Sequence, residues 1–338
     1  MRVLVTRTDR MGDVILATPV LKALRQMLPH AKIYFLVQKQ WMPILQFDEE
    51  IELIEYDPNE TISRLAARLA TYSFSRAYVL RDEKKVTWAI WRAGIPERIG
   101  PYSNFRSFFL LNRGRFQKRS KCKMHEAEYN LDLVIRKRPA KMVFELPRAW
   151  LKFSESAKRS ADRFLSAQSL SAKNFFIIHP GSSGSARYVK QVSLQDLARA
   201  LISRGDTVCV SGGPSEDPML EQFLAAVPGV KLLSQKDKLG LDGMAEVFRM
   251  ARAVIAHGTG PLHLAAAVGT PTLAIFPPIF VLSEKRWGPL QNLRSVWTPP
   301  EVFCPALYRC IGEKCEYYDC MDRFQVNEAL NRLGTLIS

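Results

Sequence analysis

A Gly-Thr-Gly turn that leads straight into an Ala-rich apolar helix is the segment of this sequence best suited to chemistry. The turn is Gly258-Thr259-Gly260, and His263 follows in the first turn of the expected helix. A helix that begins on such backbone presents unpaired N–H groups and the positive end of its dipole. The segment therefore predicts a site for a phosphate or diphosphate. His263 either contacts the phosphates there or is a buried, hydrogen-bonded histidine.

A second loop of small residues follows an expected strand earlier in the same half of the chain. It starts at His179, contains Gly181 and Ser182, and is followed by the cations Arg187 and Lys190. Small residues let the backbone approach a ligand, and the two cations can hold a phosphate. The loop matches neither a Walker A sequence nor Gly-x-Ser-x-Gly, so a plain surface loop is the alternative interpretation.

In the N-terminal half, Asp13 stands where the first expected strand gives way, through a turn, to the first expected helix. Ligands of open α/β sheets bind at the carboxyl ends of the strands. A carboxylate in that position can act as a general base, or it can simply cap the helix. The neighbouring Gly12 belongs to no Gly-x-Gly-x-x-Gly sequence, which argues against a dinucleotide site in this half.

Residues 98–123 combine apolar bulk with a run of positive charge. The apolar residues are Phe105, Phe108, Phe109, Leu110 and Leu111. The basic residues are Arg113, Arg115, Lys118, Arg119, Lys121 and Lys123. This combination suits an anionic membrane surface or an amphiphilic acceptor. Nucleic acid would also fit, and a solvated loop beside a buried strand is the structural alternative.

Short apolar strands alternate with helices along the chain, a rhythm that predicts parallel sheets with crossover helices. We expect strands at 3–5, 33–37, 76–80, 175–178, 207–210, 253–256 and 272–276. We expect helices at 19–25, 62–69, 194–202 and after the Gly-Thr-Gly turn. The fold class is therefore α/β, with a Rossmann-like domain in each half.

A chain of 338 residues is long enough for two domains with separate cores. The rhythm breaks between 136 and 170, where two prolines precede an amphipathic segment at 154–165. We expect an N-terminal domain at 1–150, a linker region at 151–172, a C-terminal domain at 173–322 and a C-terminal helix at 323–338.

The charge and hydropathy of the chain suggest where it works. No apolar run reaches the roughly 18 residues of a membrane span, and no signal-peptide pattern precedes the first strand. We therefore expect a cytoplasmic protein. The net charge of +15 favours polyanionic partners such as anionic lipid, phosphorylated glycan or nucleic acid, with solubility as the simpler explanation.

Four of the six cysteines lie close together near the C-terminus, at Cys304, Cys310, Cys315 and Cys320. Their spacing is not the paired Cys-x2-Cys of a zinc ribbon, so it is a weak indication of a metal. Free thiols are the expectation for a reducing cytoplasm, ahead of a small metal site or a local disulfide. We expect no metal and no cofactor.

Several ordered motifs together give the chain a resemblance to the ADP-heptose:lipopolysaccharide heptosyltransferase family, glycosyltransferase family 9. The resemblance covers nearly the whole length. The segments that carry it are the opening run from Met11 to Arg25, His125-Glu126-Ala127-Glu128-Tyr129-Asn130, His179-Pro180-Gly181, Gly258-Thr259-Gly260-Pro261-Leu262-His263, and Cys320-Met321 with Val326.

This resemblance implies a GT-B architecture of two Rossmann-like domains facing across a cleft, with a C-terminal helix closing it. The N-terminal domain would take the acceptor and the C-terminal domain the nucleotide sugar. The reaction would invert the anomeric centre without a metal. Asp13 would be the general base, which takes the proton of the acceptor hydroxyl.

For the donor, the resemblance implies binding through a set of residues in the C-terminal half. The N–H groups of Thr259 and Gly260 would meet the diphosphate, Lys190 and His263 match family positions, and Glu216 or Asp217 would reach the ribose. Gly181 and Ser182 complete the set. The implied donor is ADP-heptose, and the implied acceptor is a lipopolysaccharide core or lipid A-linked glycan at the inner face of the inner membrane.

Two positions depart from the family pattern. The family usually has Asp where this chain has Gly258, and it often has Trp where this chain has Val192. A related nucleotide sugar or a different glycan acceptor therefore stays open as an alternative. The alternatives from other classes are a nucleic-acid-binding protein and another enzyme with two Rossmann-like halves, such as a sugar-nucleotide epimerase. No nucleic-acid partner is expected.

Overall fold

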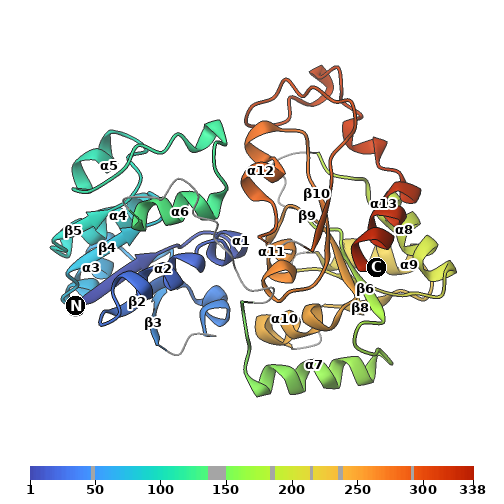
Figure 1. Cartoon of the computed structure of the whole chain (residues 1–338), viewed down its shortest axis with the longest axis horizontal. Helices are drawn as coiled ribbons and strands as arrows, with labels where there is room; N and C mark the ends of the chain where they lie inside the picture. Colours follow the sequence, from blue (N-terminus) through green and yellow to red (C-terminus); the bar gives the residue numbers. More distant parts are fainter. Residues whose placement is uncertain (47–49, 136–149, 183–186, 214–215, 235–238, 291–292) are drawn as a thin grey trace. The chain divides into compact units, whose positions relative to one another are not determined.

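The chain forms two compact units, Met1–Glu145 and Leu146–Ser338, and each is described here by itself (Figure 1). The computed structural model describes residues 1–46, 50–135, 150–182, 187–213, 216–234, 239–290 and 293–338. The division between the units falls within 136–149, outside the described residues. The predicted domain boundary at residue 150 lies at the edge of the same gap.

The first unit is built on a five-stranded parallel sheet of order β3-β2-β1-β4-β5. Its strands are β1 (Arg2–Thr6), β2 (Lys32–Gln38), β3 (Ile51–Tyr56), β4 (Arg76–Val79) and β5 (Glu97–Ile99). Its α-helices are α1 (Met11–Ile15), α2 (Pro19–Met27), α3 (Ile62–Ala70), α4 (Lys84–Arg92), α5 (Phe105–Leu110) and α6 (Glu126–Val134). The strands predicted at 3–5, 33–37 and 76–80 and the helices at 19–25 and 62–69 are confirmed.

Helices cover both faces of this sheet, which is why its central strands are runs of apolar residues rather than alternating ones. Helices α3 and α4 pack on one face, in a core with Leu4, Leu36 and Val79. Helix α3 shows how the sequence encodes this packing. Thr61 accepts a hydrogen bond from the N–H of Arg64 and so caps the helix, while Leu65 and Leu69 lie one turn apart on its buried side.

The second unit is built on a six-stranded parallel sheet of order β11-β10-β9-β6-β7-β8. Its strands are β6 (Phe175–His179), β7 (Thr207–Ser211), β8 (Lys231–Leu233), β9 (Ala253–His257), β10 (Thr272–Ile275) and β11 (Arg294–Trp297). Its α-helices are α7 (Glu155–Ala167), α8 (Gln191–Ser203), α9 (Asp217–Ala226), α10 (Gly240–Met250), α11 (Gly260–Ala267), α12 (Glu284–Trp287) and α13 (Val326–Ile337). The four strands and two helices predicted for this half are confirmed.

The second sheet is also covered on both faces. Helices α8, α9 and α13 share one core with its strands, and Figure 1 shows these helices gathered on one side of the sheet. The predicted C-terminal helix at 323–338 is therefore α13, which packs on α8 through residues such as Leu330 and Leu333. The indole N–H of Trp297 donates to the Glu328 carboxylate over 3.1 Å and ties α13 to β11.

Residues 151–172, expected as a linker, instead belong to the second unit. They contain α7, which lies along α10 (Figure 1). The N–H groups of Trp150 and Leu151 both donate to the carbonyl of Ala267 at the end of α11. The amphipathic pattern of this segment buries Ala157, Ala161 and Phe164, so its apolar face is a packing surface.

Helices α1, α4, α5 and α6 and the edge strands β3 and β5 of the first unit were not predicted. Asp13 was placed in a turn, but it lies inside α1, a five-residue helix that starts at Met11. Helix α5 occupies part of the Phe-rich segment, where Asn104 and Ser107 form a capping box. Among the helices that the structure describes, none is long and apolar enough to cross a membrane.

Candidate active site

Both sheets have a topological switch point, where the chain returns to the middle of the sheet and continues on the other side. In the first sheet this point lies between β1 and β4, and in the second between β6 and β9. Loops leaving two such strands diverge at their carboxyl ends and leave a crevice that is the usual ligand site of open α/β sheets. Asp13 follows β1 in the first unit, and the Gly181 loop and the start of α11 follow β6 and β9 in the second.

At the first switch point a buried arginine collects three carboxylates. Arg7, directly after β1, is only 2% exposed, and its guanidinium contacts Asp9, Asp13 and Glu126. The Nε–H donates to Asp9 over 2.8 Å, and one terminal nitrogen lies 3.2 Å from Glu126. The same nitrogen donates to the Asn130 side-chain oxygen over 3.0 Å. We call these five residues the Arg7 cluster.

Helix α6 supplies two members of the Arg7 cluster because Glu126 and Asn130 stand four residues apart, one helical turn, on one face. Their helix starts in a fixed position. His125 caps it by accepting from the N–H of Ala127, and Glu128 accepts from the N–H of His125. Asn130 also donates to the carbonyl of Leu16, which joins α6 to the segment that carries Asp13. The motif 125–130 is thus explained by its contact with Arg7.

Further contacts fix the rim of this cluster. Arg119 donates to the Glu126 carboxylate over 2.5 Å and to the carbonyl of Leu80 over 2.9 Å. Arg81, after β4, pairs with Asp9 at 3.2 Å. The indole N–H of Trp41 donates to the carbonyl of Asp9. Three arginines therefore stand against the three acids, two of them largely buried and the third, Arg81, 57% exposed at the rim.

The environment of Asp13 suits proton transfer. Burial raises the pKa of this carboxyl to about 6, since the nearby charge of Arg7 offsets the burial only in part, and Asp9 and Glu126 raise it further. One carboxylate oxygen of Asp13 accepts from Arg7. The other oxygen accepts no hydrogen bond from the residues described, and the side chain keeps 14% of its surface exposed. Asp13 can therefore receive a proton near neutral pH.

At the second switch point two buried histidines end the central strands. His179 is the last residue of β6 and His257 the last of β9. The His179 Nδ1 and the Ser211 hydroxyl form a hydrogen bond of 3.1 Å. Burial lowers the pKa of both histidines to about 4, and the neighbouring His179 lowers that of His257 further. Both rings are therefore neutral at pH 7. His179 is held by Ser211, whereas the two ring nitrogens of His257 are buried without a hydrogen-bond partner among the described residues.

Glu216, which the sequence predicted as a contact to the donor ribose, lies close to His179 and Gly213. Its carboxylate accepts the N–H of Gly213 over 2.6 Å and reaches to 3.7 Å from the Nε2 of His179. A Cβ added at Gly181 would overlap this carboxylate, so the backbone of Gly181 runs directly beneath it. Gly181 and Glu216 are thus brought together. Ser182 is exposed beside them, and residues 183–186 of the same predicted loop lie outside the described residues.

The start of α11 only partly matches the prediction. The Thr259 N–H, expected to face a diphosphate, donates to the carbonyl of His257 over 2.6 Å. The Gly260 N–H makes no hydrogen bond to the part of the chain that the structure describes. His263 is buried, with 4% of its surface exposed. Gly258 lacks a side chain for a steric reason, because an added Cβ would lie 2.5 Å from the ring of Phe276.

Lys190 precedes α8 at the carboxyl end of the second sheet, and its side chain is 58% exposed. Its ammonium pairs with Asp322 at 2.8 Å, and Arg187 lies 3.7 Å from the same oxygen. Asp322 was not predicted; it follows Cys320-Met321, the C-terminal motif of the resemblance. Lys190 can bind a phosphate only if its ammonium leaves the Asp322 carboxylate or contacts the carboxylate and the phosphate together. Val192 is 51% exposed on the first turn of α8.

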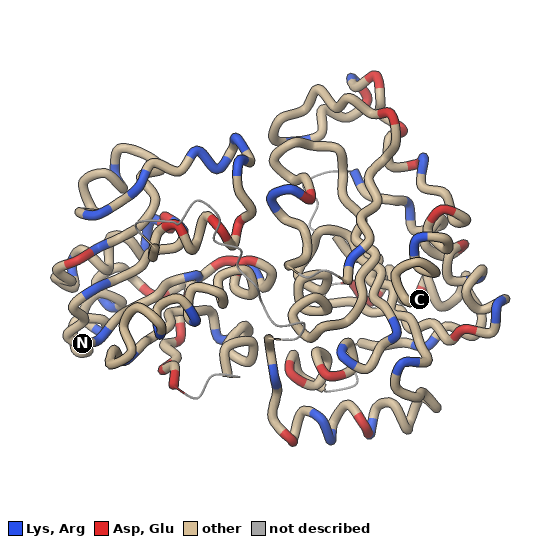
Figure 2. The backbone as a smooth tube through the Cα atoms, in the orientation of Figure 1, with Lys and Arg blue, Asp and Glu red and all other residues tan. Residues whose placement is uncertain are grey.

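The basic run predicted for an acceptor or membrane surface divides into two groups. Its arginines pair with acids of the same unit: Arg113 with Glu97 at 3.4 Å, Arg115 with Asp132 at 2.7 Å, and Arg119 with Glu126. The lysines Lys118, Lys121 and Lys123 are exposed. Figure 2 shows positive charge along the tube between α5 and α6. The lysines, and not the arginines, are available to an external anion.

Exposed aromatic side chains stand in the same part of the first unit. Phe105, Phe109 and Phe116 are 81%, 62% and 75% exposed, and Phe108 is 53% exposed. The rings of Phe105 and Phe109 contact each other with centroids 4.6 Å apart. An exposed apolar group of this size next to lysines is typical of a surface that meets an amphiphile.

Two Rossmann-like units, each with a polar cluster at its switch point, define the class of the protein: it has the fold of the GT-B glycosyltransferases. Solved structures of that class match it over their length. The glycosyltransferase family 9 protein of Veillonella parvula DSM 2008 has a TM-score of 0.83 at 19% identity, covering 99% of this chain and 97% of that one. The E. coli ADP-heptose LPS heptosyltransferase II has a TM-score of 0.79 at 23% identity, covering 100% and 98%.

The chain belongs to glycosyltransferase family 9 (heptosyltransferase), whose family model matches residues 62–301. A putative glycosyltransferase of Haemophilus influenzae is 28% identical to it, over 90% of this chain and 89% of the relative. Lipopolysaccharide heptosyltransferase 2 of Escherichia coli K12 is 25% identical, over 82% of this chain and 83% of the relative. The predicted family and fold class are confirmed.

Proposed function

We propose that this glycosyltransferase moves a heptose from ADP-heptose to a lipopolysaccharide core or lipid A-linked acceptor, with inversion at the anomeric carbon. The observation that carries the proposal is the state of Asp13 at the first switch point. Its carboxylate is held on one oxygen by Arg7 and has a pKa raised to about 6. Relatives that are lipopolysaccharide heptosyltransferases support the choice of sugar.

In this proposal the first unit binds the acceptor and Asp13 is its general base. The acceptor hydroxyl attacks the anomeric carbon and becomes acidic as the new bond forms, so a carboxylate can take its proton. The bond from that carbon to the donor phosphate breaks on the opposite side, which inverts the centre. Arg7 holds the base in place, and Glu126 and Asn130 hold Arg7.

The second unit binds the nucleotide sugar in this proposal. The Gly260 N–H, the N-terminal end of α11, Lys190 and His263 meet the diphosphate, where negative charge develops as ADP leaves. Glu216 and the backbone at Gly181 and Ser182 contact the ribose, because a carboxylate accepts hydrogen bonds from paired hydroxyls. These groups stabilise the leaving group without a metal ion.

We further propose that the exposed phenylalanines and Lys118, Lys121 and Lys123 contact the amphiphilic acceptor and the anionic inner face of the inner membrane. Apolar side chains that insert into the membrane strengthen such contact, and so do lysines that lie near lipid phosphates. The protein would then work in the cytoplasm as a peripheral membrane enzyme.

A different nucleotide sugar is a second candidate, favoured by one observation. The Phe276 ring leaves no room for a side chain at position 258, where the family pattern has an acid. A donor that needs that acid would bind poorly. Any donor selected by this site meets a glycine there in place of an acid.

Calorimetry with ADP, UDP and GDP, followed by transfer assays with matching sugar nucleotides and a heptose-deficient lipopolysaccharide, tests the proposal. Selective ADP binding and product formation from ADP-heptose support it. If transfer occurs only from another nucleotide sugar, the proposed donor is wrong, but the proposed role of Asp13 as general base stands. Binding of ADP-heptose with no transfer to any lipopolysaccharide core would refute the acceptor.

A further inference from the structure

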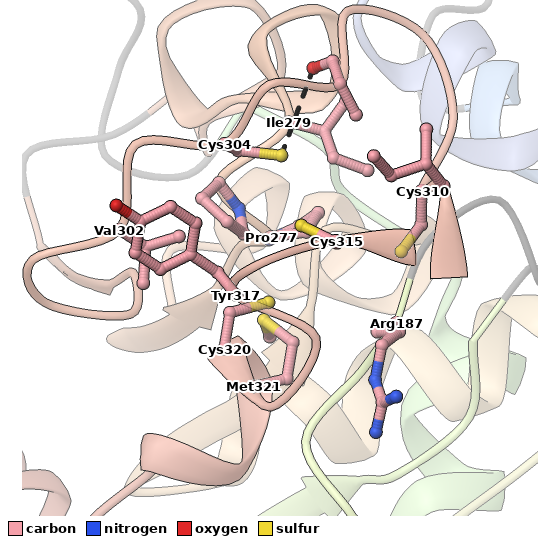
Figure 3. Close-up of a pocket in the computed structure, with 13 residues that line it drawn as sticks. Arg187, Pro277, Ile279, Val302, Cys304, Cys310, Cys315, Tyr317, Cys320 and Met321 are labelled. Carbon is pink, nitrogen blue, oxygen red and sulfur yellow. Dashed lines mark hydrogen bonds between the residues drawn. The ribbon is translucent and has the colours of Figure 1, made fainter. Parts of the chain in front are cut away.

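Four cysteines of the second unit surround one small cavity. Cys304, Cys310 and Cys315 come from the loop after β11, and Cys320 begins the 3-10 turn Cys320–Arg323. Figure 3 shows their side chains converging on this cavity, whose volume is about 20 Å³. Cysteines that are six, five and five residues apart in the sequence thus form one cluster in space.

The other walls of the cavity offer no oxygen or nitrogen ligand of the usual kinds. They include Pro277, Pro278, Ile279 and Val302, and no carboxylate or histidine is among the lining residues. Arg187 is the one charged side chain there. Sulfur is the donor atom that this site presents, and soft thiolate ligands select ions such as Zn²⁺ and Fe²⁺ over Mg²⁺ or Ca²⁺.

A backbone amide already points at one of the sulfurs. The Gly312 N–H donates to the Sγ of Cys310 over 3.4 Å. Gly312 has φ +66°, a left-handed conformation that a side chain would strain. Amides that donate to the ligating sulfur are the usual outer partners of metal-bound thiolates.

The loop lacks a packed interior of its own. Between β11 and α13 the described residues form only short 3-10 turns. Phe303, Leu307 and Tyr308 are 83%, 58% and 61% exposed, so these large side chains do not build a core. Loops of this length without secondary structure are uncommon in compact domains, and small loop-rich segments are often held by a metal.

We propose that Cys304, Cys310, Cys315 and Cys320 bind one thiophilic divalent ion, Zn²⁺ or Fe²⁺, as a tetrathiolate site that holds this loop. All four sulfurs line the same cavity, as one ion would require, whereas two disulfides need the sulfurs in contacting pairs. All six cysteines are free thiols in the structure.

Binding requires the cluster to rearrange. Among the described residues, no three His, Cys, Asp or Glu side chains already stand as a set of metal ligands. The proposal therefore requires the four thiols to move toward one another when the ion enters. Four protons leave as the ion enters, and the double negative charge that results lies beside Arg187.

Metal analysis of the purified chain tests the proposal, with Co²⁺ as a spectroscopic probe. We expect about one Zn²⁺ or Fe²⁺ per chain. Reconstitution with Co²⁺ should give the visible bands of a tetrahedral thiolate complex. Cys310→Ser and Cys315→Ser should lose both signals, and Cys122→Ser in the first unit should keep them. Metal content and spectra unchanged in the two cluster variants would overturn the proposal.

Alkylation of the unaltered chain makes the test independent of how the variants fold. With Zn²⁺ added to reduced protein, iodoacetamide labelling should fall at least tenfold at the four clustered cysteines and stay unchanged at Cys122. Equal labelling with and without Zn²⁺ would overturn the proposal. A loss of 2 or 4 Da in the purified protein, which marks disulfides among these cysteines, would overturn it as well.

Discussion

At the scale of single residues, the proposed role of Asp13 as the general base can be tested directly by substitution. Asp13→Asn keeps the shape of the side chain and removes its basicity. We expect kcat to fall by about 10²–10⁴-fold, since positioned proton transfer contributes that much. Calorimetric affinity for ADP should change by less than about twofold, because the proposed donor-binding groups lie in the other unit. Turnover close to that of the unaltered enzyme would exclude Asp13 as the base.

The raised pKa of Asp13 predicts how activity depends on pH. The base must be deprotonated, so kcat/KM should rise about tenfold per pH unit up to a pKa near 6 and level off above it. For folding the sign is opposite. The folded chain holds this proton more tightly than the unfolded chain, so this group favours folding as pH falls from about 6 toward 3.8. A flat kcat/KM between pH 5 and 7 would contradict the assignment.

Glu126 is buried between two arginines, and its removal tests the Arg7 cluster as a structural unit. Glu126→Gln leaves Arg7 and Arg119 without their shared carboxylate, which should lower the free energy of unfolding by about 3–5 kcal/mol. Asp132→Asn is the matched control. Its partner Arg115 is partly exposed, so that change should cost less than about 1 kcal/mol. Urea denaturation measures the free energy of unfolding of both variants. Equal losses would show that the Arg7 cluster stabilises the fold no more than a partly exposed ion pair does.

At the scale of elements, the central strands were predictable from the sequence, whereas the edge strands β3, β5, β8 and β11 and several helices were not predicted. Buried parallel strands such as β6 and β9 are uninterrupted apolar runs, a strong signal in the sequence. Helix α1 has only five residues, and α5 turns phenylalanines outward, so neither shows an amphipathic pattern directed at a core. The capping box at Asn104 was the local sign of α5.

The candidate site was predictable only in part, for a related reason. Asp13 was found because its position after a strand is local information. Arg7, Glu126 and Asn130 were missed as a group because Arg7 lies 119 and 123 residues from its partners on α6. The pairing of Lys190 with Asp322 was missed for the same cause. The four-residue interval between Glu126 and Asn130 was the signal that could have suggested a shared contact.

The junction between β9 and α11 gives a prediction at this scale. Gly258→Ala should destabilise the fold by about 1–3 kcal/mol, since the added methyl meets the Phe276 ring. Phe276→Ala alone should cost about 3–5 kcal/mol, because it empties a fully buried ring site. In the double variant the two effects should not add, which thermal and urea denaturation would show. Additive losses would mean that the ring does not restrict position 258.

At the scale of the whole molecule, the net charge of +15 includes a group of three exposed lysines whose contribution to membrane binding can be tested. Replacing Lys118, Lys121 and Lys123 by Gln should weaken binding to phosphatidylglycerol vesicles by about 10²-fold, since each lysine near such a surface contributes about 1 kcal/mol. Sedimentation with vesicles measures this. The control replaces Lys22, Lys32 and Lys84, which are exposed elsewhere on the first unit. An equal loss in the control would indicate a diffuse charge effect.

Each polar cluster is assembled from one continuous half of the chain. Arg7 and all its partners lie before residue 136, and His179, Glu216 and Lys190 with their partners lie after residue 172. Under the proposed function, recombination between genes of this family near the middle of the coding sequence would exchange one whole half-site and leave the other intact. Acceptor preference and donor preference can then be inherited separately, and new pairings of sugar and glycan become accessible through a single crossover.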